Sequence, residues 1–274
     1  MNNFSKELTP KNDIVFKRIF GTKGNEGILK DFLESILDIE IEYLELDLNT
    51  ELLPDFLDGK KSRVDVRTRL SDGTEVNIEM QVDTVKYNDK RCLQHWSKIY
   101  TNTIKKGEDY SKLRKTICIW ILDGEIYKEF EDIDSKWQIA NLKYGLDTYF
   151  KDLEIHIIEL KKLRKSAKLK ESKKNFWLWF IDHTNEELVN MSTVSNERIR
   201  EAREQLDKIQ SDPELMERIR LEEAYEMDVA MSINQAKKEE KIETAKKMLE
   251  KGLEIEMISE ITGLTQKEIE ELKD

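Results

Sequence analysis

Residues 62–82, SRVDVRTRLSDGTEVNIEMQV, decide the fold because they predict two β-strands joined by a tight turn. Apolar and polar residues alternate on both sides of Ser71-Asp72-Gly73, which is the period-two pattern of strands with one face on a core. A two-residue turn would point the two apolar faces in opposite directions, whereas a three-residue turn with Gly73 in the left-handed conformation aligns them. We therefore predict a three-residue hairpin.

This register places Asp65 directly across from Glu79, with Gln81 two residues along on the same face. Directly paired residues have Cβ atoms about 5 Å apart, so the two carboxylates repel unless a cation lies between them. Hard oxygen ligands of this kind suit Mg²⁺ or Mn²⁺. The alternative is a solvated polar face on which arginines of the first strand neutralise acids of the second. Those residues are Arg63, Arg67 and Arg69 against Glu79 and Asp83.

The rest of the chain alternates between helical and strand periodicity, and this predicts an α/β protein with a mixed β-sheet flanked by helices. Helical stripes cover a segment that begins near Pro10, then residues 26–37, 87–104 and 175–181. Further strands are expected near residues 39–43 and at 115–122, 135–142 and 153–160. His156 alternates with isoleucines in the last of these, which favours a structural role.

Charge and pattern divide the chain into an α/β domain, residues 1–190, and a helical C-terminal extension, residues 191–274. From residue 196 onward 22 acidic residues face 14 basic ones, whereas the preceding part is nearly balanced. Gly263 is a helix stop, and Thr265 with Glu268 forms a capping box, so the extension should end in a small helical hairpin. The last helix is rich in glutamate, which disfavours its insertion into a DNA groove.

Composition excludes several classes of protein. The longest apolar run, residues 117–122, is far shorter than the roughly 20 residues of a membrane span, and the N-terminus shows no secretory signal. The two cysteines make neither a CxxC pair nor a zinc motif. Phosphate-loop and serine-hydrolase motifs do not occur. We expect a soluble cytoplasmic protein without a membrane partner.

Four stretches together resemble the Rpn family of recombination-promoting nucleases and transposases, within the PD-(D/E)XK nuclease superfamily. They occur in the family's order and span most of the chain. The stretches are TPKNDIVFKRIFG (9–21), VDVRTRLSDGTEVNIEMQ (64–81), YNDKRCLQHWSKIYTNTIKKGEDYSKL (87–113) and AKKMLEKGLEIEMISEITGLTQKEIEELK (245–273).

The resemblance implies a restriction-endonuclease-like core that cleaves double-stranded DNA with Mg²⁺ or Mn²⁺, in recombination or transposition. Asp65 and Glu79 would bind the metal, helped by the backbone carbonyl of Met80. Gln81 stands where the superfamily has lysine; glutamine can orient a water but cannot supply charge, so the mode of water activation stays open. Asp13 is either a further metal ligand or a first-turn carboxylate that favours the helix dipole.

DNA contacts are expected from two places. Arg91 follows in the helix after the hairpin and either binds a phosphate or makes a surface salt bridge. Residues 161–174 hold eight basic residues and one glutamate, and they either follow a DNA backbone or form a solvated loop. The DNA-binding candidates in this stretch are Lys161, Lys162, Arg164 and Lys165.

A second hypothesis belongs to another class: a non-catalytic or auto-inhibited module with the nuclease fold that acts in protein or DNA binding. Gln81 and the acidic extension favour it. The extension offers two interpretations, a homodimer through its helices or a cover over the DNA groove. Loss of DNA cutting in folded variants of Asp65 and Glu79 would decide for the nuclease.

Overall fold

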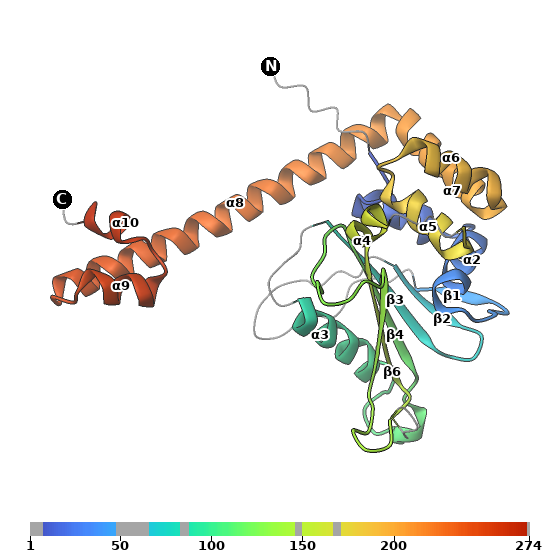
Figure 1. Ribbon diagram of the computed structural model, residues 1–274, viewed down its shortest axis with the longest axis horizontal. Coiled ribbons are helices and arrows are strands. Elements are labelled where there is room, and N and C mark those ends of the chain that lie inside the picture. The colour runs from blue at the N-terminus through green and yellow to red at the C-terminus, as the bar shows by residue number, and fades with distance from the viewer. Residues whose placement is uncertain (1–7, 48–65, 83–87, 146–149, 167–170, 273–274) are drawn as a thin grey trace. The chain divides into compact units, whose positions relative to one another are not determined.

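A computed structural model describes residues 8–47, 66–82, 88–145, 150–166 and 171–272. Its elements in chain order are α1 (Asp13–Phe20), α2 (Glu26–Leu37), β1 (Leu44–Leu46), β2 (Val66–Leu70), β3 (Glu75–Gln81), α3 (Asn88–Thr101), the 3₁₀ turn η1 (Tyr110–Lys112), β4 (Thr116–Leu122), β5 (Asp134–Gln138), β6 (Leu153–Glu159), α4 (Leu160–Lys165), α5 (Lys173–Asp182), α6 (Glu186–Ser195), α7 (Glu197–Ser211), α8 (Pro213–Glu250), α9 (Ile255–Thr262) and α10 (Gln266–Glu270) (Figure 1).

The chain forms two compact units, Met1–Ser211 and Asp212–Asp274. Helices α6 and α7 belong to the first unit, where α7 contacts α1 and α2. The division into a nuclease-like domain, residues 1–190, and a helical C-terminal extension, residues 191–274, stays a prediction.

One six-stranded sheet with the order β1-β2-β3-β4-β6-β5 forms the centre of the first unit. Strands β3, β4 and β6 run parallel, and the outer strands pair antiparallel. The central strand β4, TICIWIL, is buried along its whole length, as expected of a strand with helices on both faces. The mixed sheet with flanking helices confirms the predicted fold class. Strand β1 begins at Leu44, after residues 39–43, which were predicted as a strand but form none, and β5 is shorter than the predicted stretch 135–142.

The β2–β3 hairpin has the predicted three-residue turn. Leu70 N–H donates to Thr74 C=O at 2.9 Å, and Gly73 has a φ of 87°. Val66 therefore pairs with Ile78, and Arg67 with Asn77. Odd positions pair with odd ones along the whole described ladder, so the apolar faces of both strands lie on one side.

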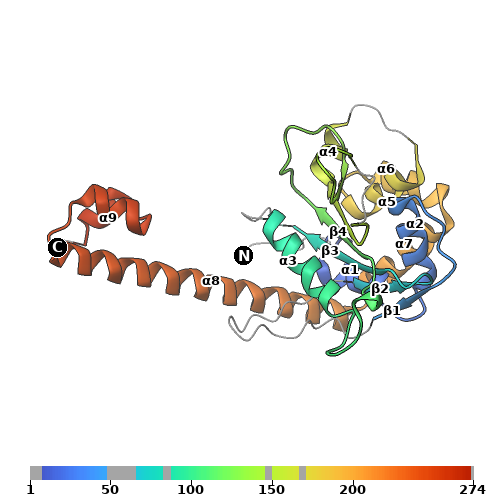
Figure 2. The same ribbon diagram turned by 90° about the horizontal axis from the view of Figure 1, so that it is seen from below.

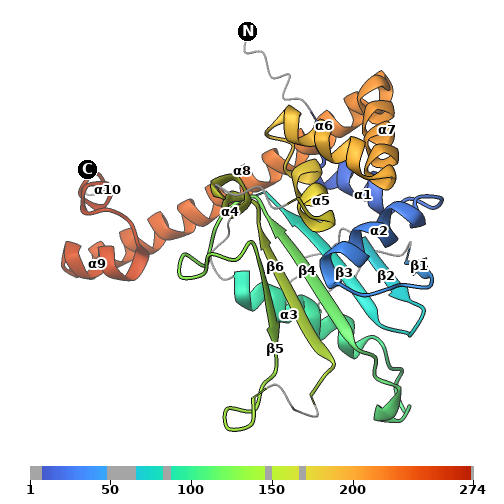
Figure 3. The same cartoon turned by 45° about the vertical axis from the view of Figure 1, so that its right-hand side comes forward.

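Helices cover both faces of the sheet (Figures 1 and 3). On one face, Cys92 and Ile99 of α3 pack against alternate residues of β4 and β6 around Trp120. Glu79 lies beside Trp120 in the parallel ladder, so the odd residues of β3 point toward α3. The even residues Val76, Ile78 and Met80 point to the opposite face.

That opposite face is covered by α1 and by the helices around it (Figure 2). Phe16, Phe20, Phe32 and Trp177 form an aromatic cluster there, with the Phe20 ring centroid 5.7 Å from that of Trp177. These four large rings are buried together, and each removes a large apolar area from water.

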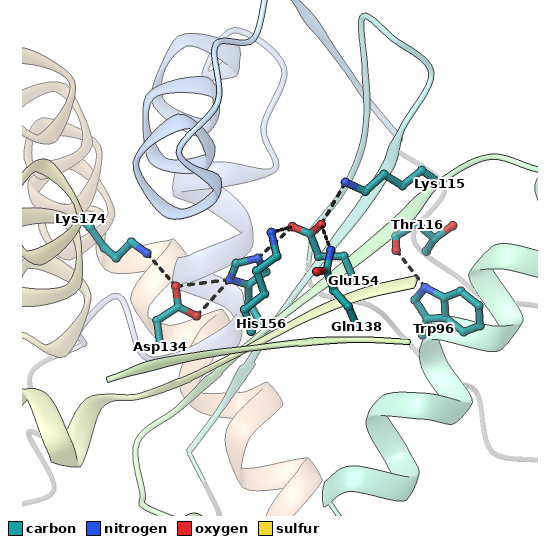
Figure 4. A network of polar contacts seen from close by, with 9 residues as sticks. Trp96, Lys115, Thr116, Asp134, Gln138, Glu154, His156 and Lys174 are labelled. Carbon is teal, nitrogen blue, oxygen red and sulfur yellow. Dashed lines mark hydrogen bonds and ion pairs between the residues drawn. The ribbon is translucent and has the colours of Figure 1, made fainter. Parts of the chain in front are cut away.

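A network of charged side chains surrounds the buried His156 on β6 (Figure 4). His156 lies between two carboxylates: Nδ1 is 3.0 Å from Asp134 Oδ1, and Nε2 is 3.1 Å from Glu154 Oε1. Lysines form ion pairs with both carboxylates: Lys174 with Asp134, and Lys115 and Lys136 with Glu154. This supports the structural role expected for His156.

The second unit ends in the predicted helical hairpin. Gly263, with a φ of 69°, ends α9, and Thr265 and Glu268 form the capping box of α10. Ala245, Ile258, Leu264 and Ile269 make its small core. Throughout the described part of the chain, no helix is both long enough and apolar enough for a membrane span.

Candidate active site on strand β3

Glu79 is a buried carboxylate on the α3 side of the sheet. Its side chain is only 3% exposed. Two groups contact its Oε1: the Asn77 amide donates a hydrogen bond at 3.1 Å, and His95 Nδ1 lies 3.3 Å away. In the described part of the chain, no lysine or arginine forms an ion pair with it. A buried carboxylate without a permanent counter-charge is costly, so the site favours a cation.

The hairpin arginines do not neutralise Glu79. Arg67 Nη2 lies 3.3 Å and Arg69 Nε 2.7 Å from Glu75, four residues back along β3. The interaction with Glu75 also raises the pKa of Arg69. The alternative of a solvated face with arginine-neutralised Glu79 is therefore wrong for the described residues. Arg63 and Asp83 lie outside them.

Gln81 ends β3 on the same face. The Asp123 N–H donates to its backbone carbonyl at 3.0 Å, which fixes the strand end beside β4. The Arg91 guanidinium donates to the Gln81 side-chain oxygen, with a long separation of 3.4 Å. Arg91 also lies over the Trp120 ring, with Cζ 5.5 Å from the ring centroid.

Helix α3 carries two residues that contact the candidate site. Arg91 and His95 are four residues apart and therefore lie on one helix face, above Gln81 and Glu79 respectively. Trp96 anchors the helix by donating from Nε1 to the Thr116 carbonyl at 2.9 Å (Figure 4). Neither His95 nor Asn77 was predicted as a site residue from the sequence. The four-residue spacing from Arg91 was the one available signal for His95.

The predicted metal ligands are placed only in part. Asp65 lies outside the described residues, so its pairing with Glu79 stays a prediction. Asp13 is the first residue of α1, where its carboxylate accepts from the Ile14 N–H at 2.8 Å. Within the described ranges, no group of three or more His, Cys, Asp or Glu side chains is placed to hold a metal.

Most of the basic side chains described in the stretch after β6 form ion pairs with carboxylates of the protein. Lys162 is buried and lies 2.5 Å from Glu159. Arg164 binds both Asp123 and Asp182, at 2.6 and 2.7 Å. Lys165 pairs with Glu125, whereas Lys161 is exposed. Contact of these residues with DNA stays a prediction. Their ion pairs with carboxylates of the protein do not favour it.

The two cysteines lie beside the site but are not suited to nucleophilic chemistry. Burial raises the pKa of Cys92 and of Cys118, and the charge of Glu79 raises both further. Both side chains therefore stay thiols at neutral pH, and a thiol is a poor nucleophile and metal ligand.

The mixed sheet, its flanking helices and the C-terminal helices define a protein with a restriction-endonuclease-like fold. Residues 10–236 match the family of PD-(D/E)XK nuclease family transposases, and the chain belongs to that family. Residues 238–274 match the C-terminal helix-turn-helix domain of the Rpn/YhgA-like nuclease family, which suggests DNA binding. Comparisons with curated proteins and with solved structures found no significant match.

Proposed function

We propose that the protein is a divalent-metal-dependent endonuclease that hydrolyses phosphodiester bonds of double-stranded DNA during recombination or transposition. The observation that carries this proposal is the state of Glu79: a buried carboxylate on the hairpin, without an arginine or lysine partner among the described residues. Its Oε2 receives no hydrogen bond from the described residues. Family membership supports the nuclease chemistry.

Glu79 and Asp65 would hold Mg²⁺ or Mn²⁺, with the Met80 carbonyl and Asp13 as further oxygen donors. Carboxylate and carbonyl oxygens are the donors that these ions prefer, and Glu79 fits as a donor because no described residue donates a hydrogen bond to its Oε2. When bound, such an ion offsets charge on the scissile phosphate and acidifies water.

Gln81 orients the attacking water through its side-chain amide, which donates and accepts hydrogen bonds but carries no charge. The water oxygen bonds to phosphorus, and the bond from phosphorus to the leaving sugar oxygen breaks. The sugar oxygen leaves as an alcohol after gaining a proton. Water loses a proton, and one phosphodiester becomes one phosphomonoester.

Nicking of supercoiled plasmid by the purified protein with Mg²⁺, Mn²⁺ or EDTA tests the proposal. Asp65→Asn and Glu79→Gln remove one charge each with little change of shape, and we expect cutting to fall by at least about 100-fold. Glu75→Gln is the matched control, since Glu75 is equally buried on the same face of β3 but belongs to the arginine pair.

Metal-dependent cutting that both site variants lose and Glu75→Gln keeps would support the nuclease. Cutting that survives in folded Asp65→Asn and Glu79→Gln protein would refute this site. A folded wild-type protein that cuts under none of these conditions would refute the activity and favour the binding module.

We also propose a homodimer through α8. Leu221, Tyr225 and Val229 are exposed on this helix at four-residue spacing, an apolar stripe of the kind that pairs helices. Light scattering should give twice the chain mass for the wild type and the single mass for Leu221→Glu/Tyr225→Glu. A monomeric wild type would refute the dimer.

A further inference from the structure

We propose that Arg91 is a catalytic residue, which supplies at the scissile phosphate the positive charge that Gln81 lacks. This inference rests on the proposed function and names a further residue for the same site. It differs from the prediction that Arg91 only anchors a DNA phosphate.

The geometry holds Arg91 beside Gln81 at the end of β3. Its Nη1 donates to Gln81 Oε1 at 3.4 Å, and its guanidinium carbon lies 5.5 Å from the Trp120 ring centroid. Trp120 is itself fully buried and pairs with Glu79 in the sheet ladder. A guanidinium between an amide and an aromatic face is oriented before any substrate binds.

Arg91 differs from the other basic residues nearby in its ion pairing. Lys162, Arg164 and Lys165 are held by carboxylates of the protein. In the described part of the chain, Arg91 has no carboxylate within ion-pair distance, and its Nε and Nη2 have no hydrogen-bond acceptor. Its charge and two donor positions therefore stay available to an anion.

The reaction needs such a charge. Attack of water places negative charge on the oxygens of the phosphorus centre, and preorganised donors at that place lower the barrier. Gln81 can orient water but cannot offset charge. Arginine, which stays protonated throughout, presents its remaining N–H groups to two phosphate oxygens without changing protonation state.

The test compares Arg91→Gln, Arg91→Lys and the double variant Arg91→Gln/Gln81→Lys with the wild type. Lys90→Gln is the matched control, because it removes one charge from the neighbouring, exposed position of α3. Single-turnover plasmid cleavage gives the rate of the chemical step. DNA affinity is measured in EDTA at several salt concentrations, and Mn²⁺ binding by electron paramagnetic resonance.

We expect Arg91→Gln to cut about 10²–10³-fold more slowly, the usual loss for one donor to a developing oxyanion. DNA affinity and Mn²⁺ affinity should change by less than about 3-fold, which corresponds to under about 0.7 kcal/mol. Arg91→Lys should keep part of the rate. Lysine at position 81 should restore the double variant at least about 10-fold over Arg91→Gln, because it returns the lost charge.

A phosphate anchor would behave differently. Weaker DNA binding, with a salt slope lower by about 0.9 and an unchanged rate at saturation, would overturn the proposal. So would a double variant no faster than Arg91→Gln. If wild-type protein cuts and Arg91→Gln cuts equally fast, only this inference fails. If wild-type protein does not cut, the proposed function fails first.

Discussion

His156→Gln should destabilise the first unit in a manner that depends on pH. The ring lies between Asp134 and Glu154 and is 3% exposed. Only the protonated ring donates to both carboxylates, and glutamine cannot replace two oppositely directed donors with a positive charge. The other charged groups that contact these two carboxylates are Lys115, Lys136 and Lys174.

The magnitude follows from what the carboxylates retain. Removing one partner of a buried ion pair costs about 3–5 kcal/mol. In the variant, Asp134 still pairs with Lys174, and Glu154 still pairs with two lysines. Because these lysines are partly exposed, we expect the free energy of unfolding to fall by about 2–3 kcal/mol. For a unit of this size that lowers the Tm by about 5–10 °C.

The sign of the pH dependence follows from the pKa shifts. Burial alone lowers the pKa of His156, but hydrogen bonds to Asp134 and Glu154 outweigh it and raise the pKa above 6.5. The contribution of protonated His156 to the stability of the first unit is complete below about pH 6.5 and is lost as pH rises through the folded pKa of His156. Burial raises the pKa of each carboxylate, but hydrogen bonds to His156 and the lysines lower both overall. Their contribution is lost as pH falls below about 4.

The Tm values of wild type and variant should therefore differ most between about pH 4.5 and 6.5, and least above the folded pKa of His156. All five tryptophans lie in the first unit, so their fluorescence follows its unfolding during heating. His183→Asn is the control, since His183 lies outside the network of charged side chains around His156 and its φ of 50° suits asparagine. An equal Tm difference at every pH from about 5 to 9 would refute the reasoning.

Two further substitutions test the packing of the first unit. Gly73→Ala should cost about 1–2 kcal/mol, because its φ is 87° and a Cβ would meet the Arg114 guanidinium. Gly107→Ala, with a φ of 88° and open space around it, should cost a similar amount, because the exposed end of Arg114 can move away from a Cβ at position 73; a clearly lower urea midpoint for Gly73→Ala would contradict this. Trp177→Phe should cost about 2 kcal/mol, because its Nε1 donates to the Asp31 carboxylate at 2.8 Å. An unchanged stability would show that the hydrogen bond is not needed.

Much of the fold could be predicted because its signals are local. Residues 26–37 form α2 with the predicted bounds, since six apolar residues follow a helical stripe. The hairpin register was predictable because side-chain parity and Gly73 leave one turn length that aligns both apolar faces. The bounds of β1 and β5 were not, because at the sheet edges pairing is fixed by one neighbour only.

The site was predictable only in part. Odd residues of β3 form a polar face in the sequence, but whether water or a helix covers that face is a tertiary matter. Helix α3 covers it, so Glu79 is buried and not solvated. The alternative in which the arginines of β2 neutralise Glu79 could be judged only in the structure, where Arg69 binds Glu75, its partner across the ladder.

The sequence by itself determined the α/β class, the hairpin with its register, and the positions of Glu79 and Gln81 on one face of β3. Only the tertiary structure decided that Arg91 and His95 contact this strand, and that Arg164 is held by two aspartates. The physical reason is range. Periodicity reports backbone geometry over a few residues, whereas a charge finds its partner through packing between distant segments.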